Sequence, residues 1–245
     1  MKAILLAAGK GSRIAKMIEP IPKSTLLVNG KPLIRNTVEM FNEFGISCTV
    51  CVGYKKEKVF EALKGLDVTY YNNPMYDITN SIISLWMAKD ALDDDVIIMN
   101  ADVFLSRDIL QLVLNDKRLN VLAFDTTRTL VGDYFFKVID GDCLQAYGKE
   151  LPLSQRSGEY VGIAKIRKEF LSIFSKRLDD MVNQQYHQQW WENVLYSFVE
   201  NKGQLIYTLD INGHFWGEID SIEDYNRILD YCKQQELMEE VICTM

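Results

Sequence analysis

Histidine is scarce in this chain of 245 residues, which contains only His187 and His214. Because histidine is the side chain most often used as a general base, its scarcity favours a reaction that needs none. His187 lies in a Gln-rich stretch that we expect at the surface. His214 lies close to a candidate acidic motif, where a structural role and a substrate contact both remain open.

Cysteine is too sparse to build a disulfide framework, because the five cysteines are odd in number and widely spaced. Cys48 and Cys51 match a C-x-x-C pattern, but they lie in a segment that reads as a strand. Residues three apart on a strand point to opposite faces, so we interpret them as core cysteines rather than as a redox or metal pair.

The sequence also lacks an apolar run of the roughly 18 residues that a membrane span needs. The N-terminal apolar stretch is short and runs into Gly, Lys and Arg, so we do not interpret it as a signal peptide. We therefore expect a cytoplasmic protein without a membrane partner.

Positive charge is in deficit, because 27 Lys and Arg stand against 34 Asp and Glu, a net charge of -7. This balance excludes a broad nucleic-acid-binding face. Basic residues still outnumber acidic ones within residues 1–70, which fits an anion site there, although chance variation gives the same asymmetry. A hydrophobic content of 48% with 11% aromatic residues excludes a disordered chain.

Strand and helix patterns alternate through residue 116. Strands are expected at 2–8, 47–52, 68–71 and 95–100, and helices at 33–44, 55–63 and 81–92. This alternation predicts an α/β, Rossmann-like fold with a mostly parallel sheet flanked by helices. Later strands joined by tight turns predict an antiparallel extension, with helices at 168–176, 185–200 and 222–235. Without a linker, we expect one domain over 1–245, with halves 1–116 and 117–245.

Four features are candidate parts of a site, and the first loop and Asp102 lie at the ends of parallel strands, where ligands of such sheets bind. They are the Gly-rich loop after the first strand, Lys23 after Pro22, Asp102 after an apolar strand, and Asp220. Two of them have an ordinary alternative. Lys23 could be a solvated surface residue, and Asp220 could be the N-cap of a helix. The glycine loop matches neither the P-loop nor the dinucleotide fingerprint, so an NAD-dependent redox protein is not favoured.

Taken together and in order, the motifs resemble a known family. They are L-A-A-G-x-G-x-R at 6–13, Pro22-Lys23, Asn73-Pro74 followed by residues 79–81, Asp102, and the segments 159–162 and 218–221. They resemble the nucleotidyltransferases that activate small phosphorylated compounds, which have a GT-A-like fold. The branch most similar is that of the phosphocholine cytidylyltransferase-like enzymes, with relatives acting on phosphoglutamine and aminoethylphosphonate.

The resemblance implies that an acceptor phosphate or phosphonate oxygen attacks the α-phosphorus of CTP and expels pyrophosphate. The product would be a CDP- or CMP-activated compound for surface polysaccharide or lipid decoration. It implies catalytic roles for Lys23, Arg13, Asp102 and Asp220, with Mg²⁺ held by Asp102 and Asp220. The nucleotide would be bound by Leu6, Ala7, Ala8, Gly9, Gly11, Ser12, Arg13, Lys23, Asn80 and Ser81. Because a phosphomonoester is mostly dianionic at neutral pH, it needs no general base.

The acceptor is expected in the acidic, aromatic-rich second half, because aromatic faces and carboxylates together suit an ammonium group. The candidates are Tyr160, Trp190, Trp191, Glu192, Trp216 and Glu218. Because Trp190 and Trp191 are adjacent on the helix predicted at 185–200, they cannot both face one pocket, and core packing is the alternative for each. The resemblance places a further pocket aromatic near Tyr134 and Phe135.

Two other functions remain open. One is a sugar-1-phosphate nucleotidyltransferase of the same fold that makes a UDP- or dTDP-sugar. The other is a binding module that has lost catalysis, which the presence of Lys23, Asp102 and Asp220 disfavours. The sequence leaves open the acceptor, a strict preference for CTP, the number of metal ions and the oligomeric state, with a homodimer among the options.

Overall fold

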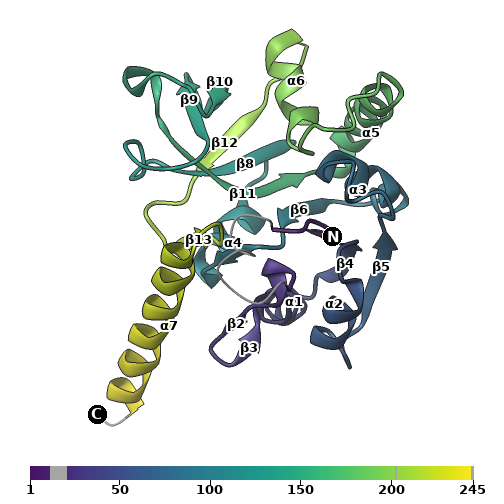
Figure 1. Ribbon diagram of the computed structural model, residues 1–245. Helices are drawn as coiled ribbons and strands as arrows, with labels where there is room; N and C mark the ends of the chain where they lie inside the picture. The colour runs from purple at the N-terminus through teal and green to yellow at the C-terminus, as the bar shows by residue number, and fades with distance from the viewer. Residues whose placement is uncertain (12–20, 202, 244–245) are drawn as a thin grey trace.

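The computed structural model describes residues 1–11, 21–201 and 203–243, and its centre is a nine-stranded mixed sheet (Figure 1). The strand order is β5-β4-β1-β6-β11-β8-β12-β10-β9. In chain order the strands are β1 (Lys2–Ala7), β4 (Ser47–Val52), β5 (Val68–Asn72), β6 (Val96–Asn100), β8 (Asn120–Asp125), β9 (Phe135–Ile139), β10 (Cys143–Gly148), β11 (Gly158–Ile166) and β12 (Tyr207–Asp210). Two small sheets pair β2 (Leu27–Val28) with β3 (Lys31–Pro32), and β7 (Val103–Leu105) with β13 (Trp216–Glu218).

The first half of the sheet is parallel, as the alternation of strands and helices predicts. β1 pairs in parallel with β4 and β6, and β4 with β5. Ile4 packs into the core on one face of the sheet, whereas Ala3 and Leu5 pack into the core on the other. A strand covered on both faces needs such a continuous apolar run, which is why β1 carries no alternating pattern.

The second half extends the sheet largely in the antiparallel sense. β11 pairs antiparallel with both β6 and β8, and the hairpin of β9 and β10 ends the strand order, with β9 also pairing antiparallel with β11. One strand departs from this scheme, because β12 lies parallel to β8. The predicted mixed sheet is thus confirmed.

Helices cover both faces of the sheet (Figure 1). The core on one face is closed by α1 (Leu33–Glu43), α2 (Lys56–Ala62) and α4 (Arg107–Asn115). The other face is covered by α3 (Ser81–Met87), α5 (Lys168–Asn183) and α6 (Asn193–Asn201). The long α7 (Ile222–Cys243) packs on the β2–β3 hairpin and then extends away from the sheet. Short 3-10 turns are η2 (Lys23–Thr25), η3 (Lys89–Ala91) and η4 (Leu153–Gln155).

The helix predicted at 185–200 is wrong in its first half, because α6 begins only at Asn193. Gln185 takes a left-handed backbone with φ 67°, just after the longer-than-expected α5. The following segment forms turns and also bonds to the start of α3. The backbone N–H groups of Asn80 and Ile82 donate to the carbonyls of His187 and Gln189, at 2.8 and 3.3 Å.

The cysteine interpretation is confirmed. Cys48 and Cys51 are buried on opposite faces of β4, and Cys48, Cys51, Cys143 and Cys232 are free thiols. Burial raises the pKa of both Cys48 and Cys51 to about 12, so neither is a thiolate at neutral pH. No helix in the described part of the chain is both long and apolar enough to cross a lipid bilayer.

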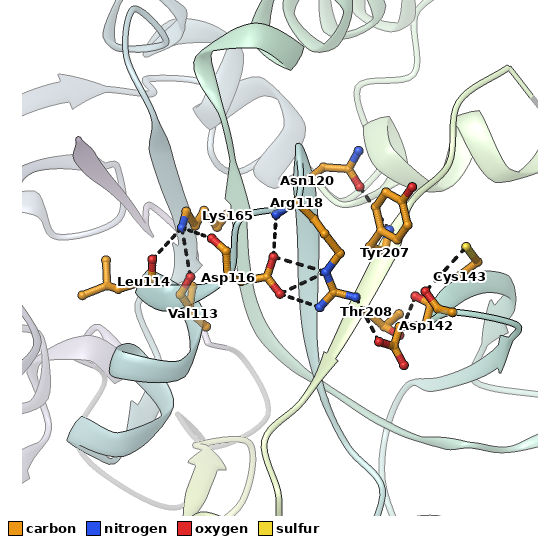
Figure 2. Close-up of polar contacts among 11 residues, drawn as sticks. Val113, Leu114, Asp116, Arg118, Asn120, Asp142, Cys143, Lys165, Tyr207 and Thr208 are labelled. Carbon is orange, nitrogen blue, oxygen red and sulfur yellow. Dashed lines mark hydrogen bonds and ion pairs between the residues drawn. The ribbon is translucent and has the colours of Figure 1, made fainter.

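A buried lysine joins the two halves at the end of α4 (Figure 2). The ammonium of Lys165, on β11, donates to the carbonyls of Val113, Leu114 and Asp116 at 3.2, 2.8 and 2.7 Å. The final carbonyls of a helix lack hydrogen-bond donors within the helix, and the Lys165 ammonium supplies these donors. Beside it, Arg118 binds Asp116 through its guanidinium and reaches Asp142 next to β10.

Candidate functional site

Three carboxylates that are distant in sequence meet beyond the end of β6. The side chains of Asp102, Glu218 and Asp220 each place an oxygen within 4.8 Å of the others. The small β7–β13 sheet brings them together, because Glu218 pairs with Val103. The backbone N–H of Ile219 also donates to the carbonyl of Asp102 at 3.0 Å.

Lys23 is inserted between these carboxylates. Its ammonium forms an ion pair with Asp220 and lies 3.4 Å from Asp102, and the residue is only 8% exposed. Burial opposes the charge, but the attraction of Asp102, Asp220 and Glu218 outweighs it, so the pKa of Lys23 is raised. The solvated-surface alternative for Lys23 is therefore wrong.

Asp220 is not the cap of α7. Ser221 and Asp224 cap that helix reciprocally: the Asp224 N–H donates to the Ser221 hydroxyl at 3.1 Å, and the Ser221 N–H donates to the Asp224 carboxylate at 3.0 Å. Because Ser221 supplies the cap, the carboxylate of Asp220 can turn toward Lys23. The N-cap alternative considered for Asp220 is therefore wrong.

The glycine loop passes directly over Lys23. Gly11 has φ +59°, and a Cβ at this position would lie 2.6 Å from the Lys23 Cγ. Only glycine allows both this backbone and this close approach. The loop and Lys23 line a small pocket together with Leu6, Ala7, Gly9, Gly11, Pro22, Ser24, Ala101 and Asp102. The predicted residues Ser12 and Arg13 lie outside the described residues.

A larger pocket adjoins the carboxylates and the glycine loop. One wall contains Leu6, Ala8, Gly9, Asn80 and Ser81, which the sequence predicts to bind nucleotide, and also Asn73, Tyr76, Thr79 and Ser84. Asn80 caps α3 by accepting the Ser81 N–H at 2.8 Å, as its position predicts. Across the opening, Lys10 of the glycine loop forms an ion pair with Asp77.

The far wall of this pocket is aromatic. Tyr134 lies edge-on to Trp190, with ring centroids 5.7 Å apart, and stacks on Tyr196 at 5.6 Å. Tyr160 also lines the pocket, and burial together with Glu192 and Glu218 holds the pKa of its phenol well above the ordinary value. The expected pocket aromatic near Tyr134 and Phe135 is Tyr134, because Phe135 is buried beneath Arg156.

The adjacent tryptophans have different environments. Trp190 is 41% exposed and lines the pocket, whereas Trp191 is fully buried. The Trp191 indole N–H donates to Asn100 Oδ1 at 3.0 Å, and its backbone N–H donates to the Ser81 hydroxyl at 2.9 Å. The acceptor contact predicted for Trp191 is therefore corrected: its side chain supports the pocket from behind.

Glu192 lies at the base of the pocket and is 5% exposed. Asn100 Nδ2 donates to its carboxyl oxygen at 3.1 Å, and burial raises the pKa of Glu192 to about 7. Glu218, placed on the acceptor side by the sequence, lines the same pocket while also belonging to the carboxylate cluster. Burial and the neighbouring Asp102 and Asp220 raise the pKa of Glu218 well above its usual range.

Trp216 is a second correction. It is 3% exposed and belongs to the core under β7, and its indole N–H donates to Asp125 Oδ2 at 2.9 Å. It does not line the pocket. Trp216 lies two residues before Glu218 on β13, so the two side chains share a face of the strand. The indole ring of Trp216 nevertheless packs into the core.

Sequence reasoning missed several pocket residues, among them Asn100, Asp133, Lys149 and Tyr196. Asn100 ends the apolar β6, which is a detectable signal, and Tyr196 was hidden in an apolar helical stripe. Asp133 and Lys149 lie in polar turns, where nothing in one sequence distinguishes them from surface residues.

The chain is similar to known proteins over most of its length. A model of the MobA-like NTP transferase domain matches residues 3–158. The choline-phosphate cytidylyltransferase of Streptococcus pneumoniae is 27% identical over 250 aligned residues, covering 96% of this chain and 100% of that protein. The CTP:phosphoglutamine cytidylyltransferase of Campylobacter jejuni is 26% identical, covering 91% of this chain and 97% of that protein.

A solved structure, that of CTP:phosphocholine cytidylyltransferase from Streptococcus pneumoniae, matches with a TM-score of 0.75 and 24% identity. The match covers 94% of this chain and 98% of that one. The structural likeness confirms the predicted fold, and the sequence matches confirm the resemblance to the phosphocholine cytidylyltransferase-like branch.

Proposed function

Since the chain belongs to the MobA-like NTP transferase family and is a nucleotidyltransferase, we propose that it transfers CMP from CTP to a small phosphorylated or phosphonate amine, releasing pyrophosphate. The observation that carries this proposal is one continuous site. Lys23 and the carboxylate cluster lie beside a pocket walled by aromatic rings and further carboxylates. A sugar phosphate offers no cation for that wall to bind.

A divalent metal fits the carboxylate cluster. Oxygens of Asp102, Glu218 and Asp220 within 4.8 Å of one another are the hard donors that Mg²⁺ prefers, and we assign Asp102 and Asp220 as its ligands. A bound Mg²⁺ would neutralise triphosphate charge and favour departure of pyrophosphate.

The chain's own residues position the nucleotide. In this proposal the backbone of Gly9 and Gly11 approaches the phosphates closely, while Lys23 stabilises charge on the α-phosphate. Arg13, although outside the described residues, is assigned to the phosphates as well. Asn80 and Ser81 lie at the start of α3, where they would contact the ribose or base.

The acceptor occupies the aromatic end of the pocket in this proposal. Trp190, Tyr134 and Tyr160 present rings to its ammonium group, and Glu192 and Glu218 supply negative charge. The attacking phosphate oxygen needs no base, because the second pKa of a phosphomonoester is near 6. The proposal assigns nucleotide binding mainly to residues 1–116 and acceptor binding mainly to 117–245, within one domain.

The decisive experiment measures pyrophosphate release with Mg²⁺, crossing CTP, UTP, ATP, GTP and dTTP with a panel of acceptors. The panel contains phosphocholine, phosphoethanolamine, 2-aminoethylphosphonate, phosphoglutamine and glucose 1-phosphate. We expect turnover with CTP and an amine-bearing acceptor. Turnover with UTP or dTTP and glucose 1-phosphate would instead identify a sugar nucleotidyltransferase.

The metal-ligand assignment predicts that Asp102→Asn and Asp220→Asn each lower kcat by at least about 100-fold, because each removes a charge that acts on the reacting phosphates. Circular dichroism should show an unchanged fold. Asp180→Asn is the matched control, since Asp180 lies on α5 and is paired only with surface Lys176. Near-normal turnover in either site variant would remove that residue from the assignment.

A further inference from the structure

The outer end of the larger pocket carries charges of both signs. Lys149 is the one basic side chain among the described residues that line it, and Asp133 lies beside it. The Lys149 ammonium is 3.6 Å from the Asp133 carboxylate. The same ammonium lies 5.5 Å from the centroid of the Trp190 ring.

The β9–β10 hairpin determines this placement. Gly148 pairs with Phe135 at the end of the hairpin, so the next residue, Lys149, lies across from Tyr134. Tyr134 in turn contacts Trp190 edge-on. The lysine is therefore held beside the aromatic wall by strand register, although its side chain remains 45% exposed.

An acceptor whose far end carries only an ammonium group would bind unfavourably at this position. Its ammonium would compete with Lys149 for the face of Trp190 and would be repelled by a like charge, whereas a cation–π contact at an exposed site is worth only about 0.5–1 kcal/mol. If the acceptor also carries a carboxylate, Lys149 attracts it, because the ammonium of Lys149 can pair with that carboxylate. The acceptor ammonium keeps the rings of Tyr134 and Tyr160 and the carboxylates of Glu192 and Glu218 as its partners.

We propose that Lys149 is a specificity-determining residue, which selects a phosphorylated acceptor whose far end is a zwitterion with both an ammonium and a carboxylate group, as in an amino acid. This inference rests on the proposed function, because it concerns the acceptor of that same reaction. It narrows the acceptor from amines in general to carboxylate-bearing amines.

Two acceptors that differ by one carboxylate test it, namely O-phosphoserine and phosphoethanolamine. With CTP and Mg²⁺, we expect kcat/KM for phosphoserine to exceed that for phosphoethanolamine by about tenfold or more, the order of one charge-assisted contact. Lys149→Met should remove this preference, because it raises the KM for phosphoserine and lowers the KM for phosphoethanolamine. Lys149→Glu should reverse the preference.

Lys137→Met is the matched control, because Lys137 lies on the same hairpin but does not line the pocket. It should leave the ratio unchanged. If both acceptors turn over and respond equally to Lys149→Met, or if phosphocholine is preferred to every carboxylate-bearing acceptor, the inference is overturned and the proposed function stands. Absence of turnover with any amine-bearing acceptor and CTP overturns both.

Discussion

Glu192 shows how enclosure changes the chemistry of a single side chain. Its carboxyl is 5% exposed and accepts from Asn100, which also accepts from the Trp191 indole. Burial is the largest cause acting on this carboxyl, and it raises the pKa from 4.5 to about 7. The native protein therefore binds a proton that the unfolded chain has released near pH 4.5.

This raised pKa predicts a pH-dependent effect of Glu192→Gln. The contribution of Glu192 to stability is fully present below about pH 4.5 and is lost as the pH rises through about 7. Glutamine cannot ionise, so the variant should be more stable than the parent at pH 8, by on the order of 3 kcal/mol, and similar to it at pH 4.5. Urea denaturation with a chelator present measures the difference, and a gain independent of pH would contradict the explanation.

At the scale of elements, the end of α4 depends on a side chain from the sheet. Three of its terminal carbonyls accept from the ammonium of Lys165, which is 3% exposed on β11 (Figure 2). Such carbonyls cost free energy when they are left without a donor in a buried position.

Lys165→Met should therefore lower the free energy of unfolding by about 2 kcal/mol, because methionine keeps most of the apolar stem and removes all three donors. Lys176→Met on α5 provides the comparison. Lys176 is 76% exposed and forms only a surface pair with Asp180, so its removal should cost less than about 1 kcal/mol. Equal losses in urea denaturation would show that Lys165 is no more important than a surface lysine.

At the scale of the whole molecule, Lys23 connects segments from both ends of the chain. It follows the first loop, whereas Asp102 follows β6 and Asp220 follows β13. The neighbouring positions of β1 and β6 and the pairing of β7 with β13 bring these segments together. The ammonium of Lys23 lies on the same carboxylates that would hold a divalent ion, so the two positive charges compete.

Removing that competitor should strengthen metal binding in the absence of nucleotide. Lys23→Met should bind Mn²⁺, followed by electron paramagnetic resonance, about tenfold more tightly than the parent, which corresponds to about 1.4 kcal/mol. The triphosphate is left out so that only the carboxylates bind the ion. Weaker binding in Lys23→Met would mean that the lysine organises the carboxylates instead of competing for them.

How far the sequence predicts the site depends on the kind of residue. The glycine loop and Asp102 are predictable because each follows a parallel strand, and the ends of such strands meet at one edge of the sheet. Lys23 and Asp220 are predictable only from the motifs that resemble the family. Trp191 was misplaced because periodicity does not reveal where α6 begins. The hydrogen bonds that end the helical pattern come from α3, more than 100 residues earlier in the chain.

The sequence by itself determined the α/β fold, the family and the convergence of the glycine loop with Asp102, because strand patterns and the short motifs around them are local properties. Only the tertiary structure decided that Trp190 and Tyr134 face the pocket while Trp191 and Trp216 support it from the core. It also placed Lys149 beside Asp133. These choices depend on hairpin register and on packing between distant segments, which no local pattern contains.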